Sequence, residues 1–265
     1  MITPILMLGA GRMGGAILEG WARAKAFAAT DIIIIDPYPS EAAQACAKAG
    51  AKLNPPEADL AAARTVILAV KPQKWLEAAG QYGSWLSADA VIVSIAAGVG
   101  AQDISREFGG RATARVMPNT AAAINRGTMS LYADDPAALA RAHALFESLG
   151  TVIDLTDENL IHAATAVAGS GPAYLYAFVE SLEAAGVVAG LSPGDASRMA
   201  RSTVIGAAAL LAETGEEPAE LRRQVTSPAG TTEAALNVLM SEHGLPPLMR
   251  EAVARAMRRS KDLGG

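Results

Sequence analysis

A glycine-rich turn between an apolar run and a helical pattern constrains the fold of this chain most strongly. Residues 5–8 are apolar and lead directly into Gly9-Ala10-Gly11-Arg12-Met13-Gly14, which a helical pattern follows. In the G-x-G-x-x-G pattern, the first glycine permits a tight turn, the second lets the backbone approach a pyrophosphate, and the third lets helix and strand pack closely. The new helix also points its free N–H groups at the phosphates. The pattern therefore predicts a dinucleotide site, although such turns also occur in strand-helix units that bind nothing.

The first half of the chain alternates short apolar runs with helical patterns. Runs without strict alternation of polar and apolar residues are typical of buried strands in a parallel sheet. We expect strands at residues 5–8, 32–35, 65–70, 91–95, 112–117, 128–132 and 152–155. Helices are expected at 41–49, where Ser40 is the N-cap and Gly50 ends the helix, and at 136–149. This order predicts an α/β fold in which residues 1–156 form a doubly wound, dinucleotide-binding Rossmann domain.

The pattern changes after Asp157, because residues 157–265 contain only helical segments punctuated by proline and glycine. One helix is expected at 172–188. A second is expected at 192–214, where Ser192 is the N-cap and Gly215 is the stop. The second helix has a broad face of small and apolar residues, which favours close packing over exposure to solvent. We therefore expect a C-terminal all-helical domain that forms a homodimer or a higher assembly of dimers.

Composition excludes several classes of protein. The net charge of −5 provides no general attraction to nucleic acid or to anionic membranes. The single cysteine, Cys46, excludes an internal disulfide framework and a zinc-type cluster, so we expect no metal site and a cytoplasmic location. Residues 160–179 carry no formal charge apart from a possible one on His162, but Gly169-Ser170-Gly171-Pro172 interrupts them. Burial in a subunit interface explains this stretch better than a membrane span.

An acidic residue at the end of the second expected strand bears on the choice of cofactor. Asp36 follows four isoleucines and lies 22 positions after Gly14. At this place in Rossmann domains, an acid binds the ribose hydroxyls of NAD and repels the 2′-phosphate of NADP. Asp36 therefore favours NAD. The alternative is that Asp36 only forms a turn before Pro37.

Two further segments end expected strands at the same edge of the sheet, where open α/β sheets bind ligands. Both stop a strand with small residues or proline and leave flat space for a nicotinamide ribose. Their candidate cofactor-binding residues are Ala69, Val70, Lys71 and Pro72 in one segment and Ala96 and Ala97 in the other. Lys71 could be catalytic, but a solvated loop lysine is the simpler interpretation.

Three more motifs follow in order along the chain. They are Arg115-Val116-Met117-Pro118-Asn119-Thr120, Ala168-Gly169-Ser170-Gly171-Pro172-Ala173-Tyr174 and Val225-Thr226-Ser227-Pro228-Ala229-Gly230-Thr231-Thr232. Together with the Ala-Val-Lys-Pro and Ile-Ala-Ala-Gly segments, they make the chain resemble the pyrroline-5-carboxylate reductase family over nearly its whole length. The resemblance implies an N-terminal Rossmann domain and a C-terminal helical dimerisation domain, which is the division expected above.

The resemblance also implies a reaction and a site. Members of the family reduce the cyclic imine 1-pyrroline-5-carboxylate to proline with NADPH or NADH, as the last step of proline biosynthesis. By the resemblance, the loop from Ser227 to Thr232 holds the substrate, with the cofactor across the domain cleft, and Thr232 supplies the hydroxyl that reaches the ring nitrogen. Local chemistry agrees, because Gly230 and Thr231 would offer N–H groups to the substrate carboxylate at a helix N-terminus.

The chain departs from the family in two places. Ala229 stands where many members have a glycine, which narrows the allowed backbone angles, and we expect binding to survive. Asp36 stands where members that prefer NADP tend to carry a neutral or basic residue, so the choice between NADP(H) and NAD(H) stays open.

The absence of one residue type separates competing enzymes. No lysine occurs between Lys74 and Lys261, which argues against 3-hydroxyacid dehydrogenases, because these related enzymes rely on a lysine in the second domain. Another imine or 3-hydroxyacid reductase is the alternative enzyme, and a regulator that binds the nicotinamide cofactor without turnover is the alternative outside enzymes. His162 is expected to be a structural residue, and Tyr174 could contact substrate or only pack.

Overall fold

Eight strands form one sheet in residues 2–263, the part of the chain that the structure, a computed structural model, describes. The spatial order is β3-β2-β1-β4-β5-β6-β7-β8. The order reverses direction between β1 and β4, which is the switch point at which open α/β sheets bind ligands. The strands are β1 (Ile5–Leu8), β2 (Ile32–Ile35), β3 (Lys52–Leu53), β4 (Thr65–Leu68), β5 (Val91–Ser94), β6 (Thr113–Met117), β7 (Gly127–Tyr132) and β8 (Gly150–Asp154).

The expected doubly wound sheet is confirmed, but its last two strands differ from a fully parallel arrangement. Strands β1 to β6 are parallel, whereas β7 pairs antiparallel with β6, and β8 is parallel to β7. The physical reason is the short connection through residues 118–126, because parallel neighbours need a crossover of a dozen or more residues. An apolar run alone does not specify the direction of its strand.

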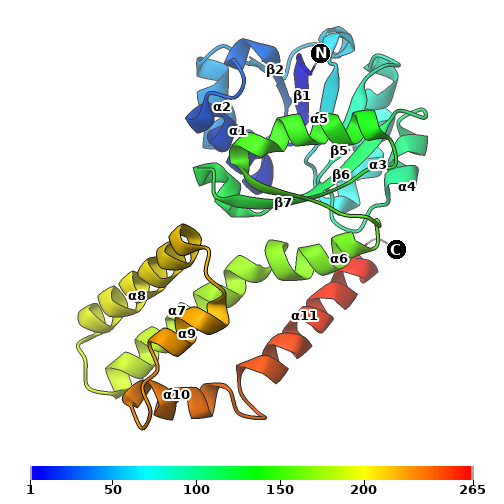
Figure 1. The fold of residues 1–265 in the computed structure, drawn as a ribbon. Coiled ribbons are helices and arrows are strands. Elements are labelled where there is room, and N and C mark those ends of the chain that lie inside the picture. Colours follow the sequence, from blue (N-terminus) through cyan, green and yellow to red (C-terminus); the bar gives the residue numbers. More distant parts are fainter. Residues whose placement is uncertain (1, 264–265) are drawn as a thin grey trace. The chain divides into compact units, whose positions relative to one another are not determined.

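Helices cover both faces of the sheet, because the side chains of each strand alternate between two buried clusters. In β1, Ile5 and Met7 belong to one cluster, and Leu6 and Leu8 belong to the other. The first cluster includes side chains of α1 (Arg12–Ala24), α2 (Glu41–Lys48) and α5 (Pro136–Phe146), and Figure 1 shows α5 crossing in front of the sheet. The second includes α3 (Trp75–Tyr82) and α4 (Ala101–Glu107). The result is a three-layer helix-sheet-helix unit.

Short helical turns complete this unit. Among its described residues, 3₁₀ turns lie at Ala29–Asp31, Glu57–Ala62, Pro72–Lys74, Gly83–Trp85, Thr120–Ile124 and Glu147–Leu149. After β8, α6 (Leu160–Ala164) continues directly into a π-helical turn at Thr165–Gly169. The π-helical turn was not predicted from the sequence.

The second unit consists of helices. They are α7 (Gly171–Val188), α8 (Pro193–Thr214), α9 (Pro218–Gln224), α10 (Thr231–Leu239) and the first part of α11 (Leu245–Asp262). The bounds expected for α8 are confirmed, because the Ser192 hydroxyl accepts the N–H of Asp195 and Gly215 ends the helix at a φ of +64°. Helices α7 and α8 pack on each other. No helix within the described residues has the length and apolar character needed to span a bilayer.

Contacts divide the chain into two compact units. One contains the described residues up to 170 together with those from 255 onward, and the other contains residues 171–254. The last turns of α11 therefore belong with the sheet, although they lie at the end of the chain. The expected domain boundary between residues 156 and 157 stays a prediction.

Candidate functional site

The three glycines of the first turn differ in what surrounds them. Gly9 has a φ of +91°, and a Cβ there would lie 2.8 Å from the carbonyl oxygen of Ala69. A Cβ on Gly14 would lie 2.5 Å from the carbonyl oxygen of Gly9. A Cβ on Gly11 would meet no atom within 4 Å. Packing of the chain thus explains Gly9 and Gly14, whereas the open space at Gly11 fits a group that approaches the backbone closely, as a pyrophosphate does.

The head of α1 supplies donors beside this open space. The first bond of the helix runs from the N–H of Gly15 to the carbonyl of Gly11, at 2.7 Å. The N–H groups of Arg12, Met13 and Gly14 precede it and have no acceptor within the helix. Ala10 differs, because its N–H donates to Oδ2 of Asp36 at 2.6 Å. The residues present therefore fit the phosphates of a dinucleotide at α1.

Asp36 lies against this glycine turn. Its side chain is buried, with 9% of the residue exposed. While Oδ2 accepts from Ala10, Oδ1 accepts the N–H of Tyr38 at 2.7 Å, which is the local bond of an Asx turn. Asp36 is therefore a turn former and also lies beside the glycine turn. Each carboxylate oxygen keeps lone pairs for further donors.

The other candidate cofactor residues follow β4 and β5 at the same edge of the sheet. Ala69 donates its N–H to the carbonyl of Leu8 at 2.8 Å, and its own carbonyl lies beneath Gly9. Val70 and Pro72 are half-buried, and Lys71 is exposed and precedes the turn Pro72–Lys74, as a loop lysine does. Ala96 is buried and Ala97 half-buried. The structure thus brings all thirteen candidate cofactor residues to one edge of the sheet.

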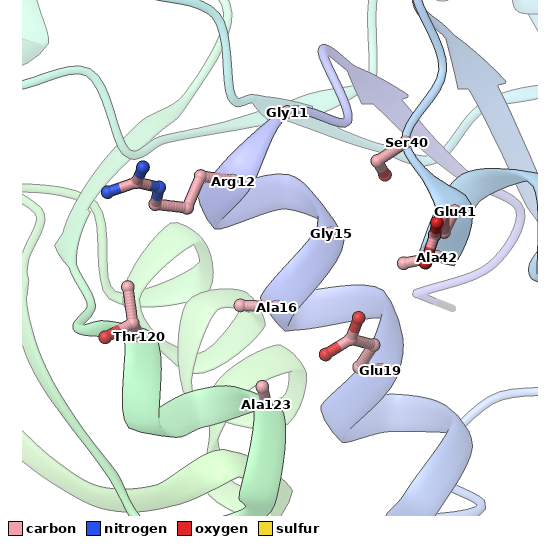
Figure 2. Close-up of a pocket in the computed structure, with 10 residues that line it drawn as sticks. All are labelled: Gly11, Arg12, Gly15, Ala16, Glu19, Ser40, Glu41, Ala42, Thr120 and Ala123. Carbon is pink, nitrogen blue, oxygen red and sulfur yellow. The ribbon is translucent and has the colours of Figure 1, made fainter.

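A cavity of about 630 Å³ opens beside the first turns of α1. Figure 2 shows its polar side chains: Arg12 extends on one side of α1, and Ser40 and Glu41 stand on the other. The lining residues are Gly11, Arg12, Gly15, Ala16, Glu19, Ser40, Glu41, Ala42, Thr120 and Ala123. The cavity therefore contains two carboxylates and one guanidinium, and the guanidinium points away from the loop that follows β2.

The candidate substrate residues lie in the second unit, in a tight turn that precedes α10. The N–H of Gly230 donates to the carbonyl of Ser227 at 3.0 Å and closes the turn. Ala229 has a φ of +57°, the positive φ that a type II turn requires at its third position. A Cβ on Gly230 would clash with the Ser227 side chain. Glu233 holds the turn, because its Oε2 accepts the N–H of Ala229 at 2.7 Å.

This geometry narrows which donors could meet a substrate carboxylate. The N–H of Gly230 is used within the turn, so it is not free for the contact expected from the sequence. Thr231 and Thr232 occupy the first two positions of α10, and their N–H groups have no acceptor within the helix. Thr231 is exposed and Thr232 half-buried. With Glu233, whose N–H also precedes the first helical bond from Ala234 to Gly230, they are the backbone donors that the head of α10 presents.

A buried polar cluster was not identified from the sequence. The Arg115 side chain is 4% exposed, and its Nη1 lies 2.9 Å from Oε1 of Glu158. The same Glu158 oxygen accepts the N–H of Ala101, at the start of α4, at 2.6 Å. His162 contacts Ser260 through Nδ1 at 3.0 Å, as a structural residue would. Burial, and next the charge of Arg115, lower the pKa of His162, which favours its neutral form.

Asn119 is a second residue whose role is visible only in the structure. Its Oδ1 accepts the N–H of Ala121 at 3.2 Å and begins the turn Thr120–Ile124. Its Nδ2 donates to the carbonyl of Ala168, in the π-helical turn, also at 3.2 Å. Asn119 therefore joins one wall of the cavity to the segment that precedes α7. The sequence placed Asn119 in a motif but did not indicate these bonds.

Comparisons with known proteins cover nearly the whole chain. Residues 158–263 match a family model described as pyrroline-5-carboxylate reductase dimerisation, and residues 4–98 match one described as NADP oxidoreductase coenzyme F420-dependent. The pyrroline-5-carboxylate reductase of Synechocystis sp. is 37% identical to this chain, and the match covers 97% of each of the two chains. The pyrroline-5-carboxylate reductase of Pseudomonas aeruginosa is also 37% identical, and the match covers 99% of this chain and 98% of the relative.

Solved structures agree with these matches. A pyrroline-5-carboxylate reductase from Coxiella burnetii has a TM-score of 0.89 at 29% identity and covers 100% of both chains. The Plasmodium falciparum pyrroline carboxylate reductase, solved with NADP bound, has a TM-score of 0.85 at 24% identity and covers 99% of this chain and 98% of its own. At 24% identity, the similarity to the Plasmodium falciparum structure shows a shared fold.

Proposed function

This chain belongs to the pyrroline-5-carboxylate reductase family, and on that basis we propose that it reduces 1-pyrroline-5-carboxylate to L-proline, the last step of proline biosynthesis. A reduced nicotinamide supplies the hydride. The observation that carries the cofactor half of the proposal is the open space at Gly11, beside the free N–H groups of the first turn of α1. No packing within the described residues requires a glycine there, whereas a pyrophosphate does.

We propose that NADH is preferred over NADPH. A 2′-phosphate would lie near the end of β2, where the Asp36 carboxylate is held at the glycine turn and Glu41 lines the cavity. The one guanidinium of the cavity lining, that of Arg12, extends on the opposite side of α1 from Ser40. Ribose hydroxyls can donate to the Asp36 carboxylate, whereas a phosphate would be repelled by it. These charges therefore favour the cofactor without the phosphate.

For the substrate, we propose that the head of α10 binds the carboxylate. The N–H groups of Thr231 and Thr232 and the positive end of the helix dipole suit a carboxylate. The Thr232 hydroxyl then orients the ring nitrogen. The turn at Ser227 and Gly230 contributes by fixing where α10 begins.

The chemistry of an imine explains why this site can work without a strong acid. Reduction of a ketone creates an alkoxide, which needs a proton donor such as lysine. Reduction of a protonated imine neutralises a cation and gives the amine directly. The chain has no lysine between Lys74 and Lys261, which agrees with imine reduction. The residues of the site act mainly by positioning.

The test is an assay of the purified protein with 1-pyrroline-5-carboxylate and each reduced cofactor, followed by absorbance at 340 nm and by detection of proline. We expect oxidation of both cofactors, with a higher kcat/KM for NADH. Cofactor binding without oxidation would instead indicate a nicotinamide sensor. Turnover of hydroxyacids alone would indicate a 3-hydroxyacid reductase.

We also propose that the chain self-associates through its helical unit, as a homodimer or as an assembly of dimers. Large apolar side chains of this unit are exposed to solvent, including Val188 at 90% exposure and Ile205 at 70%. Burial of such side chains in a partner copy would remove this apolar surface from water. A cytoplasmic location is part of the same proposal, since the single cysteine suits a reducing compartment.

A further inference from the structure

Three hydrogen bonds join Asn54 to the end of β2, although this residue belongs to no motif. The N–H of Asn54 donates to the carbonyl of Ile34 at 2.8 Å. The N–H of Asp36 donates to Oδ1 of Asn54 at 2.9 Å, and Nδ2 of Asn54 donates to the carbonyl of Asp36, also at 2.9 Å. The side-chain amide thus pairs with both polar groups of the Asp36 backbone.

This pairing extends the sheet beyond the end of β3. The backbone of β3 pairs with β2 only through Lys52 and Leu53, opposite Ile33 and Ile34. At Asn54 the backbone turns away, with a φ of +47°, and the side-chain amide takes the place of the next peptide group. Asparagine suits both requirements, because it tolerates the left-handed region better than most residues and carries a donor and an acceptor.

The two bonds between the Asn54 amide and the Asp36 backbone act on the residue whose carboxylate lies at the glycine turn. The backbone of Asp36 sets the direction of its side chain, and its two oxygens bond to Ala10 and Tyr38. Resting on the proposed use of a nicotinamide dinucleotide, we propose that Asn54 is a positioning residue for cofactor selection. By clamping Asp36, it keeps the carboxylate at the glycine turn, where the carboxylate accepts ribose hydroxyls and opposes a 2′-phosphate.

The variant that isolates this role is Asn54→Gly. Glycine adopts the positive φ without strain, so the backbone turn is kept and only the amide is lost. We expect the ratio of kcat/KM for NADH to that for NADPH to fall about 3- to 10-fold, the effect of losing hydrogen bonds that position a charged group. The fall should come from a higher KM for NADH, with kcat nearly unchanged. Fluorescence titration should show a matching rise in Kd for NADH, which requires no turnover.

Asn125→Gly is the matched control. Asn125 also has a positive φ, +57°, and its Nδ2 donates to the carbonyls of Gly20 and Ser148. Like Asn54→Gly, the control removes a side-chain amide that makes two hydrogen bonds to the backbone, at a residue with positive φ. Unlike Asn54, Asn125 makes no hydrogen bond to Asp36. It should lower stability by a similar amount and leave the ratio of the two cofactors unchanged. An equal fall of the ratio in both variants would mean that Asn54 is only structural.

A double variant tests whether Asn54 acts through Asp36. In an Asp36→Ser background, Asn54→Gly should change the ratio of the NADH and NADPH dissociation constants by less than about 2-fold, because no carboxylate is left to position. The inference would be overturned if the ratio fell about 3- to 10-fold in the Asp36→Ser background as well. It would also be overturned if Asn54→Gly alone left the ratio unchanged. If the wild-type protein binds both cofactors but does not reduce the imine, the proposed function fails, while the binding ratios still decide the role of Asn54.

Discussion

At the scale of single residues, three positions carry the proposed contacts to cofactor and substrate. Gly11, Asp36 and Thr232 have different kinds of evidence: open space at a backbone position, a buried carboxylate at the turn, and a hydroxyl at the head of a helix. Each predicts a different result on substitution. Substitution of Asp36 tests cofactor choice, substitution of Thr232 tests the chemistry, and substitution of Gly11 tests cofactor binding.

Removal of the Asp36 carboxylate should reverse the cofactor preference. Asp36→Ser removes the charge that opposes a 2′-phosphate and the acceptor for ribose hydroxyls, so the NADH to NADPH ratio of kcat/KM should fall about 10- to 100-fold. Asp36→Asn is the control, because it keeps the shape and one oxygen acceptor and should give an intermediate ratio. Steady-state kinetics with both cofactors measures the NADH to NADPH ratio of kcat/KM. An unchanged ratio in Asp36→Ser would show that Asp36 has no part in cofactor selection.

Loss of the Thr232 hydroxyl should slow the reaction. Thr232→Ala should lower kcat/KM by roughly 10- to 1,000-fold, as expected when a hydrogen bond to a polarised group is lost. Thr232→Ser keeps the hydroxyl and should retain most of the activity. Equal kinetics for the alanine and wild-type proteins would show that Thr232 has no part in the mechanism.

Ala229 should carry a measurable cost in stability. Its φ of +57° costs an alanine about 1 kcal/mol, so Ala229→Gly should raise the free energy of unfolding by a few tenths to about 1 kcal/mol. Ala235→Gly, inside the exposed surface of α10, should lower it by about 0.5–1 kcal/mol. Urea denaturation measures both, and a loss of stability in Ala229→Gly would contradict the strain argument.

At the scale of elements, the turn that leads into α1 combines glycines that packing requires with one, Gly11, for which we propose a ligand contact. Gly14→Ala should cost about 1–3 kcal/mol or more of stability, because its Cβ would lie 2.5 Å from the carbonyl oxygen of Gly9. Gly11→Ala should cost less than about 1 kcal/mol but weaken NADH binding about 10-fold or more. Denaturation and fluorescence titration would test this, and strong cofactor binding by Gly11→Ala would contradict a pyrophosphate contact there.

Elements also differ in how far the sequence predicts them. The bounds of α8 were predictable because Ser192 and Gly215 are local signals. Strand β3 was missed because two residues, Lys52 and Leu53, form no pattern. The π-helical turn was missed because one extra residue per turn leaves no sign among small side chains. The direction of β7 depends on its partner in the sheet, which local periodicity does not contain.

The same distinction applies to the candidate site. The glycine turn and Asp36 were predictable because their spacing follows a known motif. Asn54 was not, since it lies 18 residues from Asp36 and meets it only because β3 neighbours β2. Nor does the sequence show that the N–H of Gly230 is consumed within its own turn. Motifs thus indicate candidate residues, whereas the hydrogen bonds that hold these residues in place are visible only in the structure.

For the whole molecule, the proposed self-association makes a simple prediction. Ile205→Glu places a charge on α8, where the side chain is 70% exposed, and should shift the protein toward monomers. Leu76→Glu, at 55% exposure on α3 in the other unit, is the matched control and should leave the assembly unchanged. Light scattering coupled to size-exclusion chromatography measures the mass, and an unchanged mass for Ile205→Glu would place the interface elsewhere.

The exposed apolar side chains of the helical unit also affect how fast the chain assembles or aggregates. Until a newly made chain meets its partner, side chains such as Val188 and Ile205 can adhere to any other apolar surface. Productive pairing then competes with aggregation for the same molecules. Because aggregation grows with the concentration of unpaired chains, slower expression should favour soluble assembled protein over inclusion bodies.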